Sequence, residues 1–165
     1  MYFSFLLFLF FGSVSGEERG VGFVENLLKE EVLKRAEGDL QKNPVTVTDF
    51  RCDRSAGGIH DFYSEGDYWW PDSLNPAGPY VQWDGRTNPD NFVAHRYAMI
   101  RFSMLVGNLT SAYLLTNDKK YVDAALRHIR AWFIDNKTKM NPNLLFAQAI
   151  KGRATGRGVG IIDTI

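Results

Sequence analysis

A short segment, residues 57–72 with the sequence GGIHDFYSEGDYWWPD, concentrates residue types that can move protons or bind ligands. Its glycines and proline exclude a regular helix or strand along its whole length. His60 and Tyr63 are candidates for proton transfer, because imidazole and phenol groups are common general acids and bases. Asp67 and Tyr68 could support the same step. The segment therefore allows acid–base chemistry or the binding of a polar ligand.

Aromatic residues are dense in the same region. Trp69 and Trp70 are adjacent, and Tyr80 and Trp83 follow a short distance along the chain. Aromatic faces stack on sugar rings or other apolar planes, while their polar edges stay hydrated. The same rings could instead pin the segment onto neighbouring helices. Residue types alone leave both roles open.

A basic segment, KGRATGRG at residues 151–158, could bind an anionic ligand. Arg153 and Arg157 each carry a guanidinium fork that can bind a carboxylate with two hydrogen bonds. The alternative is a solvated basic turn. A phosphate-binding loop is not indicated, since the GxxxxGK[ST] pattern is missing. No histidine or second cysteine lies at metal-ligand spacing from Cys52, so neither a metal nor a cofactor is expected.

The composition indicates a globular protein without a large overall charge. The 165 residues carry a formal net charge of +0, and 45% of them are hydrophobic. A strongly basic domain is the usual sign of nucleic-acid binding, so no nucleic-acid partner is expected. Attraction of an anionic ligand must then come from a local group of cations.

Residues 1–16, MYFSFLLFLFFGSVSG, are typical of a signal peptide. The apolar run is too short to span a bilayer as a helix, and small residues follow it. The alternative is a buried N-terminal helix. With the signal peptide removed, residues 17–165 would form one domain of a secreted protein, extracellular or periplasmic, without a membrane partner.

Apolar residues at helical spacing predict three long helices and one short helix after residue 16. Glycine and proline recur through residues 51–89, which predicts a long structured loop. Residues 45–50, VTVTDF, alternate as in a strand. A short polar turn at 116–119 makes the helices on either side antiparallel neighbours. The predicted helices are 24–38, 91–115, 120–134 and a short one that begins at Asn141-Pro142.

Three longer stretches resemble the alginate lyase domain family of polysaccharide lyases. They are RSAGGIHDFYSEGDYWWPD, NPAGPYVQWDGRTNPDNF and YVDAALRHIRAWFIDNKTKMNPNLLFAQAIKGRATGRGVGIIDT. The resemblance runs from about Pro44 to the end of the chain, in the family's order. It implies an all-α fold, an (α/α) toroid of antiparallel helical hairpins around a groove. The toroid is expected to be incomplete here, as the N-terminal part of such a domain, with a long aromatic-rich loop.

The resemblance also implies a function, cleavage of alginate or a related uronic-acid polysaccharide by β-elimination. The family's Asn-His pair and Tyr/Arg set are expected beyond Ile165, so this chain alone is expected to lack its main catalytic residues. A non-catalytic carbohydrate-binding protein, a structural helical protein and a hydrolase with paired carboxylates remain as alternatives. The residues expected to bind the polyuronate are Tyr63, Asp67, Tyr68, Trp69, Trp70, Gln148, Arg153 and Arg157.

Overall fold

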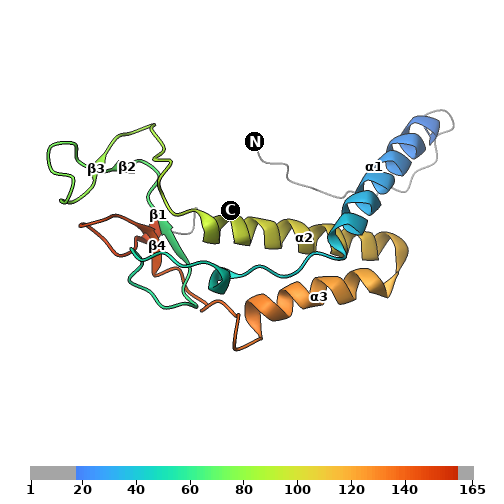
Figure 1. Ribbon diagram of the computed structural model, residues 1–165. Helices are drawn as coiled ribbons and strands as arrows, with labels where there is room; N and C mark the ends of the chain where they lie inside the picture. The colour runs from blue at the N-terminus through green and yellow to red at the C-terminus, as the bar shows by residue number, and fades with distance from the viewer. Residues whose placement is uncertain (1–17, 160–165) are drawn as a thin grey trace.

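Three helices supply most of the regular structure in the computed structural model (Figure 1). It describes residues 18–159, with side chains from Asn26 onward. The helices are α1 (Glu18–Asp39), α2 (Ala94–Thr116) and α3 (Lys119–Phe133). They confirm the three long helices that the sequence predicts, although α1 begins earlier than expected. The signal peptide predicted at residues 1–16 lies outside the described residues.

Helices α2 and α3 form the antiparallel hairpin that the sequence predicts, and a tight turn joins them. Asn117 adopts the left-handed conformation, with φ of 55°, and its N–H donates to the carbonyl oxygen of Tyr113. This geometry is a common way to end a helix. Asp118 then caps α3, because its carboxylate accepts from the backbone N–H of Lys120 at 3.0 Å. The polar turn therefore stops one helix and starts the next.

Small side chains hold the three helices close together. Helix α1 packs on the hairpin through a core in which alanines meet Leu109 and Tyr121. The hydroxyl of Tyr121 also donates to a carboxylate oxygen of Glu37 on α1 at 2.7 Å. The buried members of this core are Ala36, Leu109, Ala112, Tyr121, Ala124 and Ala125.

The strand predicted at residues 45–50 is wrong, because this segment forms a 3₁₀ turn, η1 (Val47–Asp49). Thr46 and Asp49 form a capping box: the Asp49 carboxylate accepts from the N–H of Thr46 at 2.7 Å, and the Thr46 hydroxyl bonds the backbone in return. Such local side-chain bonds compete with strand pairing. Val47 is fully buried, so one apolar residue of the alternating pattern still packs in the core.

A second core joins η1 to the end of the hairpin. Trp132 of α3 packs with Val47, Phe62 and Ala98, and its indole N–H donates to the carbonyl oxygen of Val45 at 2.9 Å. Trp132 is 1% exposed, so this hydrogen bond satisfies its polar atom inside the core. The contact anchors the start of the long loop on the helices.

Two small sheets lie at the other end of α2 from α1 (Figure 1). Strand β1 (Tyr63–Glu65) pairs in parallel with β4 (Phe146–Ala149), with an irregular register. Strand β2 (Trp69–Trp70) pairs with β3 (Val81–Gln82) in antiparallel fashion. The rest of the segment from 51 to 89 is irregular, which agrees with the predicted structured loop.

The short helix predicted to begin at Asn141-Pro142 is wrong, because strand β4 occupies that segment. The N–H of Asn141 donates to the carbonyl oxygen of His60 at 2.8 Å, and its amide donates to Asp61 at 2.7 Å. These bonds align the segment with the loop that leads into β1. Pairing with a distant strand has overridden the local helical pattern.

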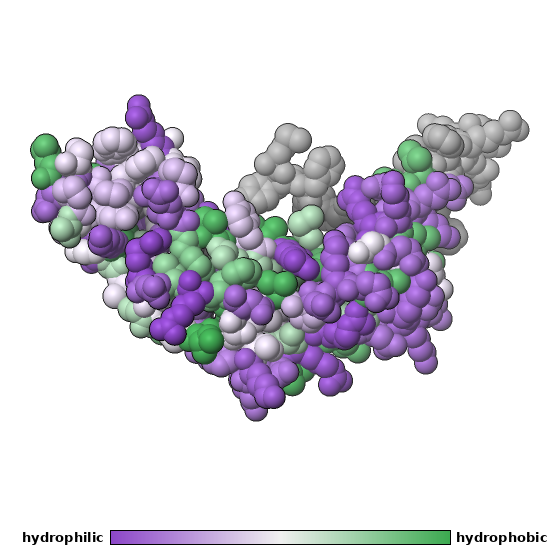
Figure 2. All heavy atoms as spheres, viewed as in Figure 1, coloured by the Kyte–Doolittle hydropathy of each residue, from purple (hydrophilic) through white to green (hydrophobic). Residues whose placement is uncertain are grey.

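Helix α2 leaves part of its apolar surface uncovered by the described residues. Tyr97, Met104 and Leu114 are 64%, 63% and 77% exposed. Figure 2 shows hydrophobic side chains gathered over the middle of the molecule, whereas hydrophilic ones dominate the end formed by α1 and α3. By length and composition alone α2 could cross a membrane, but its packing between α1 and α3 is that of the central helix of this unit.

Replacing Leu109 by alanine should destabilise the helical core. Leu109 is fully buried, so the Leu109→Ala variant loses transfer free energy and leaves a cavity, at a cost of roughly 3 kcal/mol. The matched control is Leu114→Ala on the exposed side of the same helix, expected to change the free energy of unfolding by less than about 0.5 kcal/mol. Urea unfolding followed by circular dichroism measures both. Equal losses in the two variants would contradict this packing.

Candidate functional site

The segment from 67 to 88, termed here the aromatic arm, projects from the sheet end of the molecule (Figure 1). The rings of Trp70 and Trp83 lie 5.5 Å apart, and the indole N–H of Trp70 donates to the carbonyl oxygen of Arg86 at 2.8 Å. Tyr68 and Trp83 are 41% and 46% exposed. The ring pair therefore braces the arm, as one of the two roles left open by the sequence requires, and the exposed rings of Tyr68 and Trp83 leave the other role a prediction.

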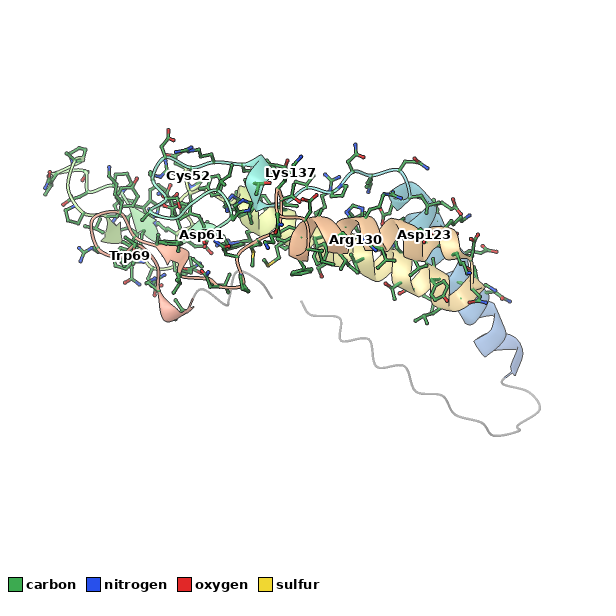
Figure 3. The ribbon with its side chains drawn as sticks, turned by 90° about the horizontal axis from the view of Figure 1, so that it is seen from below. Cys52, Asp61, Trp69, Asp123, Arg130 and Lys137 are labelled. Atoms are coloured by element: carbon green, nitrogen blue, oxygen red, sulfur yellow. The ribbon has the colours of Figure 1, made fainter. Side chains whose placement is uncertain are left out.

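Cations from the basic segment lie against the rings of the arm. The guanidinium of Arg153 lies 5.3 Å from the ring centroid of Trp69, and its Nε donates to the carbonyl oxygen of Tyr80 at 2.6 Å. The ammonium of Lys151 lies 5.5 Å from the ring of Tyr80. Such contacts stabilise by cation–π attraction and leave the charge uncancelled. Figure 3 shows Trp69 at this end, away from Asp123 and Arg130 along α3.

Gln148 of β4 has a strained backbone and is nearly buried. Its φ is 55°, in the left-handed region that a residue with a side chain seldom adopts. Its N–H donates to the hydroxyl of Ser64 at 2.8 Å. Arg157 donates to its carbonyl oxygen at 2.9 Å and to its side-chain oxygen at 2.8 Å. Strain that the surroundings enforce in this way is typical of functional positions.

Gly66 allows the arm to approach the basic segment closely. A Cβ atom at this position would lie 2.7 Å from the Trp69 ring and 3.0 Å from Nη2 of Arg157. Its N–H donates to the carbonyl oxygen of Ala149 at 2.9 Å, and its carbonyl oxygen accepts from Asn91 at 2.9 Å. The absence of a side chain therefore brings Trp69 and Arg157 to one place.

A buried carboxylate, Glu65, ties several segments together beneath the arm. Arg54 binds it with two charge-assisted hydrogen bonds of 2.6 and 2.7 Å. The hydroxyl of Tyr63 donates to it at 3.0 Å, and the N–H of Phe92 donates at 2.7 Å. Burial alone would raise the pKa of Glu65, but these donors outweigh it and lower the pKa below its usual value. Glu65 is therefore ionised in the folded protein at neutral pH.

The two residues predicted for proton transfer lie in different surroundings. Tyr63 is 3% exposed, and burial, followed by the charge of Glu65, raises the pKa of its phenol. It is a hydrogen-bond donor here and is not poised to lose its proton. His60 lies on the loop before β1, where its Nδ1 contacts the carbonyl oxygen of Lys139 at 2.7 Å. The structure does not bring these two side chains together as a pair.

His95, which the sequence did not single out, supports the same region from α2. Its Nδ1 accepts from the N–H of Tyr63 at 2.9 Å, so Nε2 carries the proton and lies 3.2 Å from the carbonyl oxygen of Phe50. Burial lowers the pKa of His95, which keeps the ring neutral. This is a structural role in positioning β1.

Asp67 faces α2, where Arg96 binds its carboxylate at 3.1 Å. The backbone carbonyl oxygen of Asp67 also accepts from the N–H of Asn88 at 2.7 Å. These contacts hold the base of the aromatic arm against the helix. The structure therefore gives Asp67 a positioning contact. Its carboxylate does not take part in the contacts of Lys151 and Arg153 with the aromatic rings.

A pocket of about 430 Å³ lies between the basic segment and the Glu65 network. Arg54 and Tyr63 form one wall, and residues 149–155 form the other, including Lys151 and Arg153. The sequence alone did not single out Arg54, because its pairing with Glu65, 11 positions away, gives no periodic signal. A larger cleft, of about 580 Å³, lies between α1 and α2 and contains none of the predicted site residues.

No cluster of three or more His, Cys, Asp or Glu side chains suitable for a metal occurs within residues 18–159. The pocket instead offers the cations Arg54, Lys151 and Arg153 and the ring of Tyr63, and Arg153 lies against the ring of Trp69 next to it. Such a set can bind the carboxylate and ring of an acidic sugar through hydrogen bonds and stacking.

Comparison with known proteins agrees with a site for an acidic sugar. The sequence matches the alginate lyase family model over residues 46–164. The crystal structure of an alginate lyase from Bacteroides ovatus superposes with a TM-score of 0.71 and 37% sequence identity. The match covers 82% of this chain and 36% of that chain, so this chain spans about a third of the length of that relative. No curated protein matches the sequence.

Removing the charge of Glu65 should destabilise the sheet end in a pH-dependent way. At pH 7, Glu65→Gln is expected to lower the free energy of unfolding by about 1–3 kcal/mol, the usual cost of losing hydrogen bonds to a buried charged group. Because the pKa of Glu65 is lowered in the folded state, its ionised form stabilises the protein above the unfolded pKa, about 4.3, and that stabilisation disappears as pH falls through the folded pKa.

The difference in stability between the wild type and the Glu65→Gln variant should therefore begin to shrink below the unfolded pKa, about 4.3, and disappear once the pH lies below the folded pKa. Denaturant unfolding at a series of pH values measures the difference. The control is Glu31→Gln, since Glu31 forms an exposed pair with Arg35 and should matter little. A difference between wild type and Glu65→Gln that stays constant down to acid pH would contradict the assigned ionisation.

Proposed function

Because this chain belongs to the alginate lyase family, we propose that it acts as a polysaccharide lyase on alginate or a related uronic-acid polysaccharide. The observation that carries the proposal is the family match together with the structural similarity to an alginate lyase. The pocket supports it, since cations next to aromatic rings suit an acidic sugar chain. A non-catalytic carbohydrate-binding protein is not favoured by any of these features.

The proposed reaction is β-elimination. The proton on C5 of a uronate is adjacent to the carboxylate and is poorly acidic while that carboxylate carries its full charge. A lyase must bind or neutralise the carboxylate, remove the C5 proton, and protonate O4 as the bond from C4 to O4 breaks. Donors aimed at the carboxylate stabilise the charge that builds up as the proton leaves. Cationic and amide groups are the appropriate donors.

Gln148 and Arg153 are the proposed donors to the uronate carboxylate. Arg157 acts mainly as a positioning residue, because its guanidinium holds the backbone and side chain of Gln148. Trp69, with Tyr68 and Trp70, provides the proposed stacking surface for the sugar rings. Tyr63 and Asp67 are proposed to support this surface from beneath. The buried, donating phenol of Tyr63 leaves removal of the C5 proton to another group.

We also propose that the α2–α3 hairpin is one unit of an (α/α) toroid, and that residues 1–16 direct secretion. A repeated hairpin of this kind presents its loops and connecting segments at the ends of the helices. The arm and the basic segment lie at such an end (Figure 1). A secreted protein would meet polysaccharides outside the cell or in the periplasm.

Incubation of the protein with alginate and with other polyuronates tests the proposed reaction. β-Elimination creates a double bond between C4 and C5, which raises ultraviolet absorbance as the polymer is cut. Binding without new absorbance would favour the carbohydrate-binding alternative. Release of saturated sugars without new absorbance would indicate a hydrolase. Either result would replace the proposed lyase activity.

Replacing Trp69 or Arg153 by alanine should weaken polyuronate binding while the fold is kept. Each variant removes one half of the cation–ring contact, so the dissociation constant is expected to rise roughly tenfold. Arg130→Ala is the control, since Arg130 is an exposed residue on α3, away from the arm (Figure 3). Calorimetric titration with alginate oligosaccharides measures binding, and circular dichroism checks the fold. Unchanged binding in both variants would remove these residues from the site.

A further inference from the structure

We infer that Arg54 binds the carboxylate of a sugar residue in the 430 Å³ pocket and makes the protein prefer acidic over neutral oligosaccharides. This inference rests on the proposed function, since it assigns a specificity role at the same site. Arg54 lies outside the basic segment, and its side chain reaches the pocket from the opposite wall. The pocket thus receives cations from two parts of the chain that are far apart in sequence.

The guanidinium of Arg54 is held in place by one edge only. Nε and Nη2 donate to the two carboxylate oxygens of Glu65, and Nη2 also donates to the carbonyl oxygen of Asp90 at 3.3 Å. Nη1 bonds to no other residue within the described part of the chain. The side chain is 43% exposed. Its orientation is therefore fixed while one nitrogen stays open to a ligand.

Glu65 cannot compete strongly for an incoming ligand, because its oxygens already have donors on every side. Besides Arg54, the hydroxyl of Tyr63 and the N–H of Phe92 donate to it. Its side chain is 7% exposed, so its negative charge is shielded from the pocket. A ligand carboxylate at Nη1 would meet a preorganised donor, which reduces the entropy lost on binding.

The other cations of the pocket are also available. Lys151 and Arg153 contact aromatic rings and a carbonyl oxygen, and neither forms an ion pair with a described carboxylate. The residues that line the pocket include no Asp or Glu. Positive charge in a concave site with low-dielectric walls attracts anions more strongly than the same charge on a flat surface. A chain of zero net charge thus contains a locally cationic pocket.

Arg54 could instead serve only to neutralise Glu65. The two roles differ in what they change. A purely structural Arg54 would affect folding stability and the binding of acidic and neutral sugars alike. An Arg54 that contacts the ligand carboxylate would affect the acidic sugar alone.

The test compares two hexasaccharides, of which only one carries carboxylates. They are a hexamer of mannuronate and neutral mannohexaose. Wild-type protein is expected to bind the acidic hexamer at least tenfold more tightly. Arg54→Met should reduce that preference about tenfold and leave mannohexaose binding unchanged. Arg54→Lys keeps the charge but loses the fork, and should fall between the two. Arg51→Met is the matched control. Arg51 is 85% exposed, and its ion pair with Asp53, at 3.9 Å, is long and lies in solvent, so its loss should matter little.

Isothermal titration calorimetry gives the dissociation constants, and thermal unfolding of each variant shows whether it is folded. If Arg54→Met fails to fold, the inference is tested by the preference of Arg54→Lys for the acidic hexamer and by the salt dependence of binding to the wild type. Binding of the acidic hexamer should weaken as salt rises, while binding of mannohexaose should not. Equal losses for both ligands, or the same effect in Arg51→Met, would overturn the inference.

The outcomes separate this inference from the proposed function. An Arg54-dependent preference for the acidic hexamer, without any unsaturated product, would remove the lyase proposal and leave the carboxylate site standing. Unsaturated product together with an unchanged preference in the Arg54 variants would overturn the site alone. Absence of preference in the wild type would overturn the site directly.

Discussion

The carboxylate of Glu65 is the point on which the sheet end of the molecule depends. It binds Arg54 from the preceding loop, Tyr63 from its own strand, and the N–H of Phe92 just before α2. A buried charge is tolerated only when hydrogen bonds and an opposite charge compensate it. Those requirements fix three segments in one arrangement. The positions of the arm and of the pocket follow from that arrangement.

Next to this network, the backbone at Gly66 lies unusually close to the side chains of Trp69 and Arg157. The lack of a side chain at Gly66 allows Trp69 to lie against the basic segment. The backbone of Gln148 is strained, and hydrogen bonds from Arg157 to its carbonyl and side-chain oxygens fix it. Neither feature stabilises the fold by itself. Both become understandable if the surface must present a ring, an amide and a guanidinium to one ligand. The rigidity comes from the helices, and the specific contacts come from irregular backbone.

Helix periodicity and turn chemistry were enough to predict α1, α2, α3 and the antiparallel turn at 116–119, because these depend on neighbours a few residues away. The segments 47–49 and 146–149 were predicted wrongly, since side-chain capping decided the first and pairing with a distant strand decided the second. The aromatic and basic residues of the site could be chosen by type. The partnership of Arg54 with Glu65 could not, because it has no periodic trace in the sequence.

The parallel pairing of β1 with β4 has a consequence for how the protein folds. Ser64 and Gln148 are 84 positions apart, so their contact closes a long loop of chain and carries a large entropic cost. The α2–α3 hairpin is built from residues close in sequence and can form without that closure. Contacts of high sequence separation tend to form late. The sheet end of the molecule is accordingly expected to assemble after the helices, and to open first in native-state hydrogen exchange.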